Sequence, residues 1–281
     1  MKKIAVIPNV NKDQDLVVTN AVIKKLVSLN LDVFVRVDIK VDRDGVTLYN
    51  DFPEEIDLAI VVGGDGSVID ASMLAIEKNI PILGVNLGKV GYLTEVEVDG
   101  LNVLDNLVSG EYFIAEKMLL SVDFENESHS CDRYAVNDVT ISRDGFLHIA
   151  NIKIEDSIGN AVKLRSDGVI LSTPQGSTAY SFSSGGPIVA HDVESILLTP
   201  ISSHSFFNRS VIFNSSDVIK VTNMGEPSLN VSVDGRFVSV LSSGETCEIT
   251  KASKTFKILT FTKNSMFSSL FKKMRILGDI E

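Results

Sequence analysis

The chain has 281 residues, is 44% hydrophobic and carries a formal net charge of −11. This length and apolar content predict a stable globular protein with room for two domains. The acidic charge argues against general binding to nucleic acid or to an anionic membrane, because both require a basic surface. Two distant cysteines, Cys131 and Cys247, suggest neither a disulfide framework nor a zinc cluster. Without a signal peptide or an apolar run long enough to span a bilayer, the sequence predicts a cytoplasmic protein.

The first 113 residues alternate strand-like and helix-like patterns, which is typical of βαβ units around a parallel sheet. The expected strands are residues 3–9, 32–39, 58–64 and 81–86, and the expected helices are residues 15–29 and 67–78. The strand over 58–64 is apolar throughout, as are strands that are buried on both faces of a parallel sheet.

The most informative segment is the end of that strand, LAIVVGGDGS at residues 58–67. Open α/β sheets bind ligands at the carboxyl ends of their strands, and glycines there let backbone N–H groups approach an anion. Asp65 is the functional side chain of this turn, and we expect it to accept a hydroxyl proton or to act through a metal ion. An ordinary acidic turn residue is the alternative. Candidate contacts to a phosphate or to a phosphoryl donor are Gly63, Gly64 and Ser67, of which Ser67 is also expected to cap the following helix.

Two familiar phosphate motifs are excluded by counting residues. A G-x-G-x-x-G frame that starts at Gly64 places Ile69 at its last glycine, and GVNLGKV at residues 84–90 is one residue short and lacks the hydroxyl residue of a P-loop. The longer segment GVNLGKVGYLT, residues 84–94, is a second glycine-rich strand end. We expect it to lie beside the first, either as a ligand contact or as a plain loop.

From Met118 onward the apolar residues alternate with a period of two, which indicates an antiparallel β domain. The expected strands are residues 119–124, 137–143, 148–156, 164–174, 218–223, 229–240 and 246–252. A further buried strand over 255–261 and a helix over 265–277 follow. The predicted fold is therefore α/β plus all-β, with an α/β nucleotide-binding domain at 1–115 with 255–281 and an antiparallel β domain at 116–254.

Three polar segments of the second domain carry candidate chemistry. Asn137-Asp138 places an amide beside a carboxylate at the start of a strand, either to pair with an adenine edge or a ribose diol or as a polar turn. Arg165 and Asp167 offer a cation and a carboxylate, either to a ligand or to each other. The segment 173–187, TPQGSTAYSFSSGGP, suits a ligand with a flat base and hydroxylated sugars, with a serine-rich surface loop as the alternative. The histidines without a companion at metal-ligand spacing are interpreted as structural, namely His148, His191 and His204.

Read in order, these motifs resemble the signature series of the NAD kinase family. The series is GGDGS at 63–67, GVNLGKVGYLTE at 84–95, ND at 137–138, RSDG at 165–168 and TPQGSTAYSFSSGGPIV at 173–189. The resemblance spans about residues 58–240, and the last motif is the most specific. A GGDG turn alone is shared with 6-phosphofructokinases and with diacylglycerol or sphingosine kinases.

The resemblance implies a Rossmann-like N-terminal domain, an antiparallel β domain and a C-terminal tail that packs back on the first domain. It implies ATP-dependent phosphorylation of the adenosine-ribose 2′-hydroxyl of NAD, with a divalent metal ion such as Mg²⁺, in a homodimer or homotetramer. Asp65 would be the general base. The NAD contacts implied by the resemblance are Asp65, Gly66, Asn137, Asp138, His148, Arg165, Asp167, Thr178, Ala179, Tyr180, Ser181, Phe182 and Ser183. Among these, Asn137, Asp138 and the residues of the serine-rich stretch would hold the adenosine, and Arg165 with Asp167 would reach the nicotinamide side.

Two departures from the family pattern bear on the phosphoryl donor. Residues 71–73 are Ala-Ser-Met where many relatives carry an arginine, and Arg236 stands where the family often has glutamine. The donor, ATP or polyphosphate, is therefore left open. Two other functions are also weighed, namely a lipid or sugar kinase that shares the GGDG turn and a non-catalytic NAD(P)-binding sensor. The first predicts an exposed apolar groove or a membrane-binding element, and the second predicts a lost base or an added output module.

Overall fold

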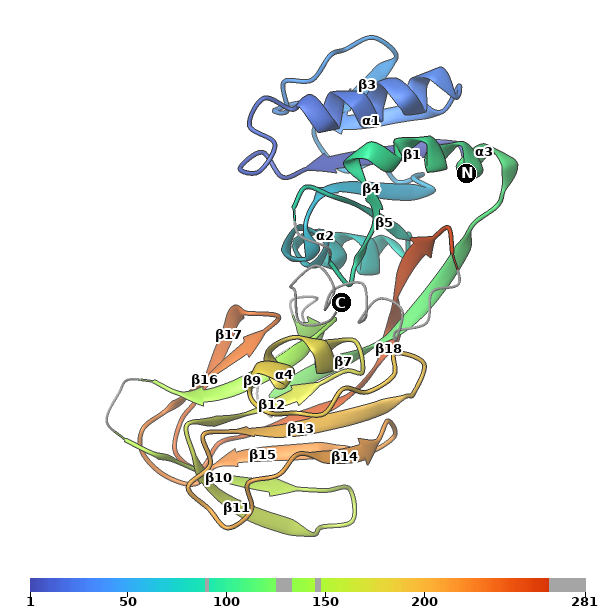
Figure 1. Ribbon diagram of the computed structural model, residues 1–281. Helices are drawn as coiled ribbons and strands as arrows, with labels where there is room; N and C mark the ends of the chain where they lie inside the picture. The colour runs from blue at the N-terminus through green and yellow to red at the C-terminus, as the bar shows by residue number, and fades with distance from the viewer. Residues whose placement is uncertain (89–90, 125–132, 145–147, 263–281) are drawn as a thin grey trace, which may run out of the picture. The chain divides into compact units, whose positions relative to one another are not determined.

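Figure 1 shows the computed structural model of the chain, which describes residues 1–88, 91–124, 133–144 and 148–262. The chain divides into two compact units. The first unit is Met1–Glu116 together with Phe256–Glu281, and the second unit is Lys117–Thr255. The second unit is thus inserted within the chain of the first. The helix expected over 265–277 and Cys131 lie outside the described residues.

The first unit is built on a parallel sheet with the strand order β5-β4-β1-β2-β3. The strands are β1 (Lys3–Pro8), β2 (Asp32–Arg36), β3 (Val46–Tyr49), β4 (Leu58–Gly63) and β5 (Ile82–Asn86), with the short β6 (Thr94–Glu97) beside β5. The chain fills the sheet outward from β1 on one side and then returns to fill it from β4 on the other. Open α/β sheets bind their ligands at this reversal, outside the carboxyl ends of the strands. The predicted α/β class of the N-terminal part is confirmed.

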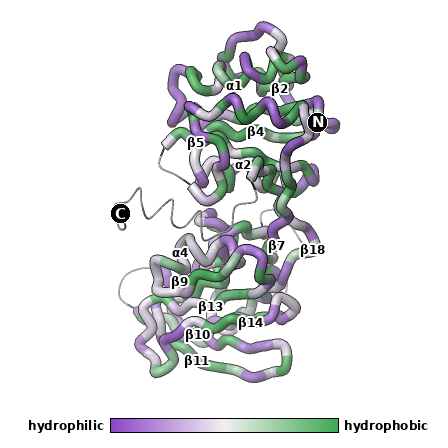
Figure 2. Tube along the Cα trace, turned by 45° about the vertical axis from the view of Figure 1, so that its right-hand side comes forward, coloured by the Kyte–Doolittle hydropathy of each residue, from purple (hydrophilic) through white to green (hydrophobic). Residues whose placement is uncertain are grey.

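Helices cover the two faces of this sheet. On one face lie α1 (Val17–Ser28), η1 (Val98–Asp105) and α3 (Asn106–Ser109), which form one apolar core with alternate residues of β1 and β4. The buried residues of α1 recur at helical spacing, which gives the helix one apolar side. On the other face α2 (Asp65–Lys78) packs against β4 and β5. Every residue of β4 is buried, and Figure 2 shows this strand coloured as hydrophobic.

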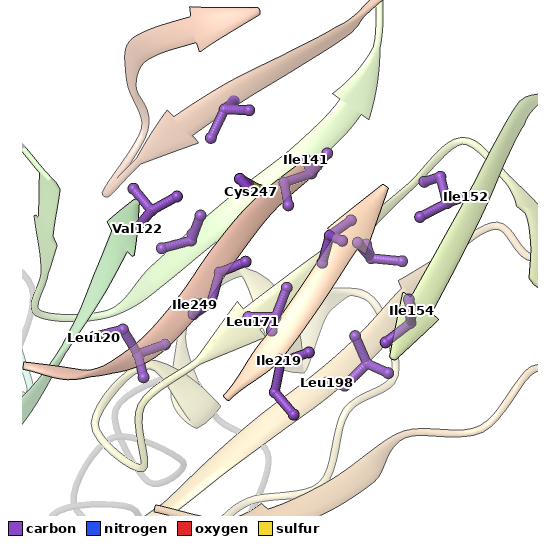
Figure 3. Close-up of a cluster of buried hydrophobic side chains, with 14 of the residues drawn as sticks. Leu120, Val122, Ile141, Ile152, Ile154, Leu171, Leu198, Ile219, Cys247 and Ile249 are labelled. Atoms are coloured by element: carbon purple, nitrogen blue, oxygen red, sulfur yellow. The ribbon is translucent and has the colours of Figure 1, made fainter. Parts of the chain in front are cut away.

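The second unit is a sandwich of two largely antiparallel sheets. One sheet has the order β11-β10-β15-β18, with β7 beside β18 and β8 beside β7, and the other has the order β14-β13-β12-β9-β16-β17. The strands are β7 (Phe113–Phe124), β8 (Tyr134–Ala135), β9 (Asp138–Arg143), β10 (Ala150–Glu155), β11 (Ala161–Ser166), β12 (Gly168–Ser172), β13 (Ser195–Ile201), β14 (Val211–Asn214), β15 (Ile219–Asn223), β16 (Leu229–Val233), β17 (Arg236–Leu241) and β18 (Thr246–Thr260). The apolar residues of both sheets meet in one core (Figure 3), where each fully buried aliphatic side chain contributes about 1.5–3 kcal/mol.

A single strand, β18, contributes to both units. Its first part pairs antiparallel with β15 in the second unit, with Ile249 opposite Ile219. Its last residues belong to the first unit, where Ile258 pairs in parallel with Ile82 of β5 and Leu259 is buried in the core. The predicted return of the tail to the first domain is confirmed as far as the described residues extend.

Several predicted elements differ from the observed ones. The strand expected over 32–39 ends at Arg36, because the chain turns there and the N–H of Ile39 bonds to the carbonyl of Arg36. The segment expected as one strand over 164–174 is two strands, β11 and β12, which lie in different sheets. The two strands expected at 246–252 and 255–261 are the single strand β18. Strands β3, β13 and β14 were not predicted. No helix among the described residues has the length and apolar character needed to cross a membrane.

Candidate active site

Asp65 lies at the point where β4 passes into α2 in the first unit. The strand ends at Gly63, Gly64 is extended, and Asp65 is the first residue of the helix. Its carboxylate accepts two backbone hydrogen bonds, from the N–H of Tyr92 to Oδ2 at 2.8 Å and from the N–H of Leu93 to Oδ1 at 3.0 Å. Two such bonds fix the orientation of the carboxylate and favour its ionised form. Each oxygen keeps a second lone pair with which to accept a proton.

Gly91 allows the loop after β5 to come this close to Asp65. A Cβ atom at position 91 would lie 2.0 Å from Asp65 Oδ1 and 2.6 Å from the hydroxyl of Thr94. Only a glycine fits such an approach without displacing the carboxylate. The second glycine-rich strand end therefore lies beside the first, as the sequence predicted.

Ser67 does not have the predicted capping role. The helix begins at Asp65 with Gly64 as its N-cap residue, so Ser67 lies within the first turn. Its hydroxyl is 2.7 Å from the side-chain nitrogen of Asn9, which donates a hydrogen bond to it across the ends of β1 and β4. Gly64 can start the helix because the carboxylate of Asp65 is used for the loop after β5, and no side chain is needed as a cap.

The loop after β1 brings a lysine to the glycine turn, residues 63–66. The side-chain oxygen of Asn9 accepts hydrogen bonds from the backbone N–H groups of Asn11 and Lys12, at 3.1 and 3.3 Å. Lys12 Nζ then lies 3.1 Å from where a Cβ atom of Gly64 would stand. A lysine ammonium beside a glycine turn at a helix N-terminus can hold a phosphate group, because all of these groups attract negative charge.

In the second unit, Asn137 and Asp138 stand at the start of β9, where a second carboxylate holds their backbone. Asp234 lies in the tight turn between β16 and β17 and accepts hydrogen bonds from the N–H groups of Val136, Asn137 and Asp138 at 2.8, 2.8 and 3.1 Å. In return, the N–H of Asp234 bonds to the carbonyl of Asp138 at 2.9 Å. The pair that the sequence singled out is therefore held rigidly at one end of a buried sheet.

Asp138 itself is buried, with 5% of its surface exposed. Burial raises the pKa of its carboxyl to about 7, the nearby charge of Asp234 adds to the increase, and the hydrogen bond from Thr140 opposes it. Burial also raises the pKa of Asp234, although its three backbone hydrogen bonds act in the other direction. A carboxyl that is neutral near pH 7 can donate a hydrogen bond as well as accept one, which suits the edge of a base.

This pKa predicts a pH-dependent stability. Because the pKa of Asp138 in the folded protein exceeds its ordinary value of 3.8, its contribution to stability is complete below pH 4 and is lost as the pH rises through about 7. We expect Asp138→Asn to remove a decrease in the free energy of unfolding of about 1.4 kcal/mol per pH unit between pH 5 and 7. Urea unfolding at pH 5, 6, 7 and 8 measures this, with Asp99→Asn at an exposed site as the control. An unchanged pH slope in Asp138→Asn would contradict it.

The serine-rich segment, residues 173–187, folds against this pair. Its chain is anchored by the N–H of Thr173, which bonds to the carbonyl of Asn137 at 2.9 Å. A Cβ atom at Gly176 would lie 2.0 Å from the same carbonyl oxygen, so this close approach also requires glycine. The segment contains η3 (Gly176–Thr178) and α4 (Tyr180–Ser183). It is therefore an ordered, packed segment, in contrast to the alternative of a serine-rich surface loop.

Within the serine-rich segment the side chains divide into buried anchors and exposed groups. Ser181 is buried, and its hydroxyl is 2.8 Å from the hydroxyl of Thr199 on β13. The rings of Tyr180 and Phe182 are 45% and 54% exposed, although such rings are usually buried. Thr178 and Ala179 connect η3 to α4. Two exposed rings on a well-anchored backbone are available for stacking against a ligand.

The remaining predicted residues of the second unit are not gathered around the Asn137-Asp138 pair by any contact described above. Asp167 forms its ion pair with Arg143, at 2.7 Å between Oδ1 and Nε, and not with Arg165. Arg165 is exposed, and its backbone bonds to Ser205 and His204. The other two predicted residues are also exposed, Arg236 as the first residue of β17 and His148 just before β10. The interpretation of Arg165 and Asp167 as an internal pair is wrong, because Arg143 takes that place.

Comparisons with known proteins match both halves of the chain. Residues 4–112 match the family model of the ATP-NAD kinase N-terminal domain, and residues 136–261 match that of the ATP-NAD kinase C-terminal domain. The chain belongs to the ATP-NAD kinase family. Members of this family resemble it over nearly its whole length. It is 34% identical to the NAD kinase of Thermoanaerobacter sp., with 98% of this chain and 99% of that protein covered, and 36% identical to the NAD kinase of Caldanaerobacter subterraneus, with 97% and 98% covered.

Two solved structures of kinases have the same fold. A yeast NADH kinase crystallised with NADH superposes with a TM-score of 0.83 and 22% identity, covering 100% of this chain and 89% of that one. An NAD kinase from Archaeoglobus fulgidus in complex with ATP gives a TM-score of 0.72 and 24% identity, with 97% and 98% covered. The predicted fold class of this ATP-NAD kinase family member, α/β plus all-β, is confirmed.

Two groups of site residues were missed in this ATP-NAD kinase family member. Asn9 and Lys12 were overlooked because the loop PNVNKD after the first strand has no glycine signature, although its position at a strand end was a usable signal. Asp234 was overlooked because SVDGR resembles an ordinary hairpin turn. Both act by holding the backbone of residues that are far away in the sequence.

Proposed function

We propose that this chain is an NAD kinase that transfers the γ-phosphoryl group of ATP to the 2′-hydroxyl of the adenosine ribose of NAD, giving NADP and ADP. The observation that carries the proposal is the Asp65 carboxylate, held by the N–H groups of Tyr92 and Leu93 beside the glycine turn in a chain of the ATP-NAD kinase family. A base with fixed orientation beside a phosphate-binding turn is what transfer to a hydroxyl requires.

Phosphoryl transfer passes through a loose transition state, so catalysis consists mostly of alignment and of charge neutralisation. In this chain Asp65 would orient the ribose hydroxyl and finally accept its proton. Lys12 and the free N–H groups of the first turn of α2 would offset the negative charge on the transferred group. Gly66, in that first turn, leaves the approach to Asp65 free of side-chain bulk, since no atom lies within 4 Å of where its Cβ would stand.

The acceptor, NAD, would be held by the second unit. Asn137 and Asp138 would pair with the adenosine, because their backbone is fixed by Asp234 and their side chains offer donors and acceptors. The segment from Thr178 through Ser183 would contribute the exposed rings and the backbone groups that line such a ligand. We extend the proposal to the residues that the family pattern alone suggests, which are His148, Arg165, Asp167 and Arg236.

A divalent metal ion, a homo-oligomeric assembly and a cytoplasmic location also belong to this proposal. Within the described ranges, no three His, Cys, Asp or Glu side chains come together as a metal site. Mg²⁺ is usually held by one or two carboxylates together with substrate phosphates, and Asp70, which lines the same cavity as Ser67, is a carboxylate suited to that arrangement. The metal would supply neutralisation of the phosphate charge.

The proposal is tested by incubating the purified protein with NAD, ATP and Mg²⁺ and measuring NADP. We expect NADP to form in step with ADP, at a rate that depends on both substrates. Parallel reactions with polyphosphate in place of ATP, and with NADH in place of NAD, measure the choice of donor and acceptor. If the protein binds NAD but forms no NADP with any donor, it is a sensor and not an enzyme.

A further inference from the structure

Two adjoining cavities lie outside the carboxyl ends of the parallel strands of the first unit. The switch-point cavity, about 370 Å³, lies between the ends of β1 and β4 and is lined among others by Asn9, Ser67 and Asp70. The aromatic cavity, about 310 Å³, lies at the ends of β1, β2 and β3 and is lined among others by Tyr49 and Phe52. Both are of the size of ligand pockets. They share Ile7, Pro8 and Leu74, so they form one continuous depression.

The switch-point cavity has the features of a phosphate site. Asn9 and Ser67 line it and are bonded to each other, and the loop that Asn9 organises carries Lys12 to the glycine turn. No ion pair of Lys12 with another described residue is present. A ligand whose phosphates reach the glycine turn would therefore extend along this cavity, and its other end would enter the aromatic cavity.

The aromatic cavity has the features of a base site. The rings of Tyr49 and Phe52 meet edge to face, with their centroids 5.6 Å apart and their planes inclined by 78°. Arg36 at the end of β2 lines the same cavity, and its guanidinium is held in place by two hydrogen bonds to Asp38 at 2.5 and 2.7 Å. Aromatic rings and a fixed guanidinium plane offer stacking surfaces to a flat base. Buried apolar side chains such as Ile39 complete the floor.

We propose that the aromatic cavity binds the nucleoside of the phosphoryl donor, with Tyr49 and Phe52 as its stacking surface, while the donor's phosphates run through the switch-point cavity to Lys12. This inference rests on the proposed function and adds to it a place and a chemical class for the donor. A donor without a base, such as polyphosphate, leaves the aromatic cavity without an occupant. The cavity therefore favours a nucleoside triphosphate over polyphosphate.

The decisive experiment compares binding of ADP and of pyrophosphate, which differ by the nucleoside. Titration calorimetry is done with saturating NAD and Mg²⁺, so that ADP is not bound at the acceptor site. We expect Phe52→Ala to weaken ADP binding about 5- to 100-fold, since stacking on one ring is worth about 1–3 kcal/mol, and to change pyrophosphate binding less than twofold. Lys12→Met is expected to weaken both ligands. Phe113→Ala, an exposed ring on β7, is the matched control and is expected to change neither.

A second variant keeps the proposal testable if Phe52→Ala fails to fold. Leu74→Trp fills the depression from α2 without removing the aromatic pair, and it is expected to weaken ADP binding at least tenfold. Unchanged ADP binding in the folded variant or variants would overturn the proposal. The proposed function is judged separately by NADP formation in the wild-type protein. Normal NADP formation with unaltered ADP binding in the variants refutes only the donor site, and loss of ADP binding in a protein that forms no NADP refutes only the reaction.

Discussion

Asp65→Asn is expected to lower kcat for NADP formation by about 10²–10⁴-fold, which is the usual effect of removing a general base. The loss corresponds to about 3–5 kcal/mol of transition-state stabilisation. The amide cannot accept the hydroxyl proton, and its nitrogen faces a backbone N–H that the carboxylate oxygen now accepts. The affinity for NAD is expected to change much less, because the proposed adenosine contacts lie on other residues. Steady-state kinetics with varied NAD and ATP, together with direct titration of NAD, separates the two effects.

Glu77→Gln is the matched control for this experiment. It makes the same carboxylate-to-amide change at an exposed position near the other end of α2. We expect wild-type kcat from this variant. A kcat within threefold of wild type in a folded Asp65→Asn would rule out Asp65 as the base and would leave the hydroxyl proton to solvent or to phosphate oxygen.

Gly91→Ala is expected to lower kcat by about 10²-fold without changing any reactive group. The added methyl group would lie 2.0 Å from Asp65 Oδ1, so the carboxylate or the loop after β5 has to move. A misplacement of about 1 Å at a reacting group can cost about 10²-fold in rate. The expected signature is a lower kcat with the KM for NAD nearly unchanged, measured in the same assay and accompanied by the melting temperature of the variant.

Gly88→Ala is the control within the same loop. A Cβ atom at position 88 meets no atom within 4 Å, so the same chemical change is made in open space. Wild-type kinetics for Gly88→Ala and a slow Gly91→Ala would show that the position of the Asp65 carboxylate limits the rate. Equal kinetics for both variants would show that the carboxylate tolerates displacement, which contradicts the fixed orientation inferred from its two hydrogen bonds.

Local sequence patterns predicted the framework of the first unit. The apolar strand β4, the glycine turn and the helix α2 follow each other within 21 residues, from Leu58 to Lys78, and each has a local signal in apolar spacing or in glycine. The antiparallel strands of the second unit were predicted from alternation for the same reason. Strand β13 was missed because SILLTPI is apolar on nearly every position and does not alternate.

Contacts across long stretches of sequence could not be predicted. The partners of Asp65 lie 27 and 28 positions away, and those of Asp234 lie 96 to 98 positions away. Such partners are set by strand order and register, which local patterns do not contain. Asp167 illustrates the point, because Arg165 is nearer in the sequence while Arg143 is the residue that the pairing of β9 with β12 brings to it. The same limit applies to Lys12, whose loop meets the glycine turn only because β1 pairs with β4.

The path of β18 sets the order in which a ribosome can release finished parts. Domains that are continuous in sequence can fold as soon as their last residue has emerged, beginning with the N-terminal one. Here the N-terminal part stays one strand short until Ile258 has been synthesised, whereas the inserted part is complete at Thr255. During translation the later-made domain therefore closes first, and the Asp65 turn waits in an unfinished sheet until the last edge strand arrives.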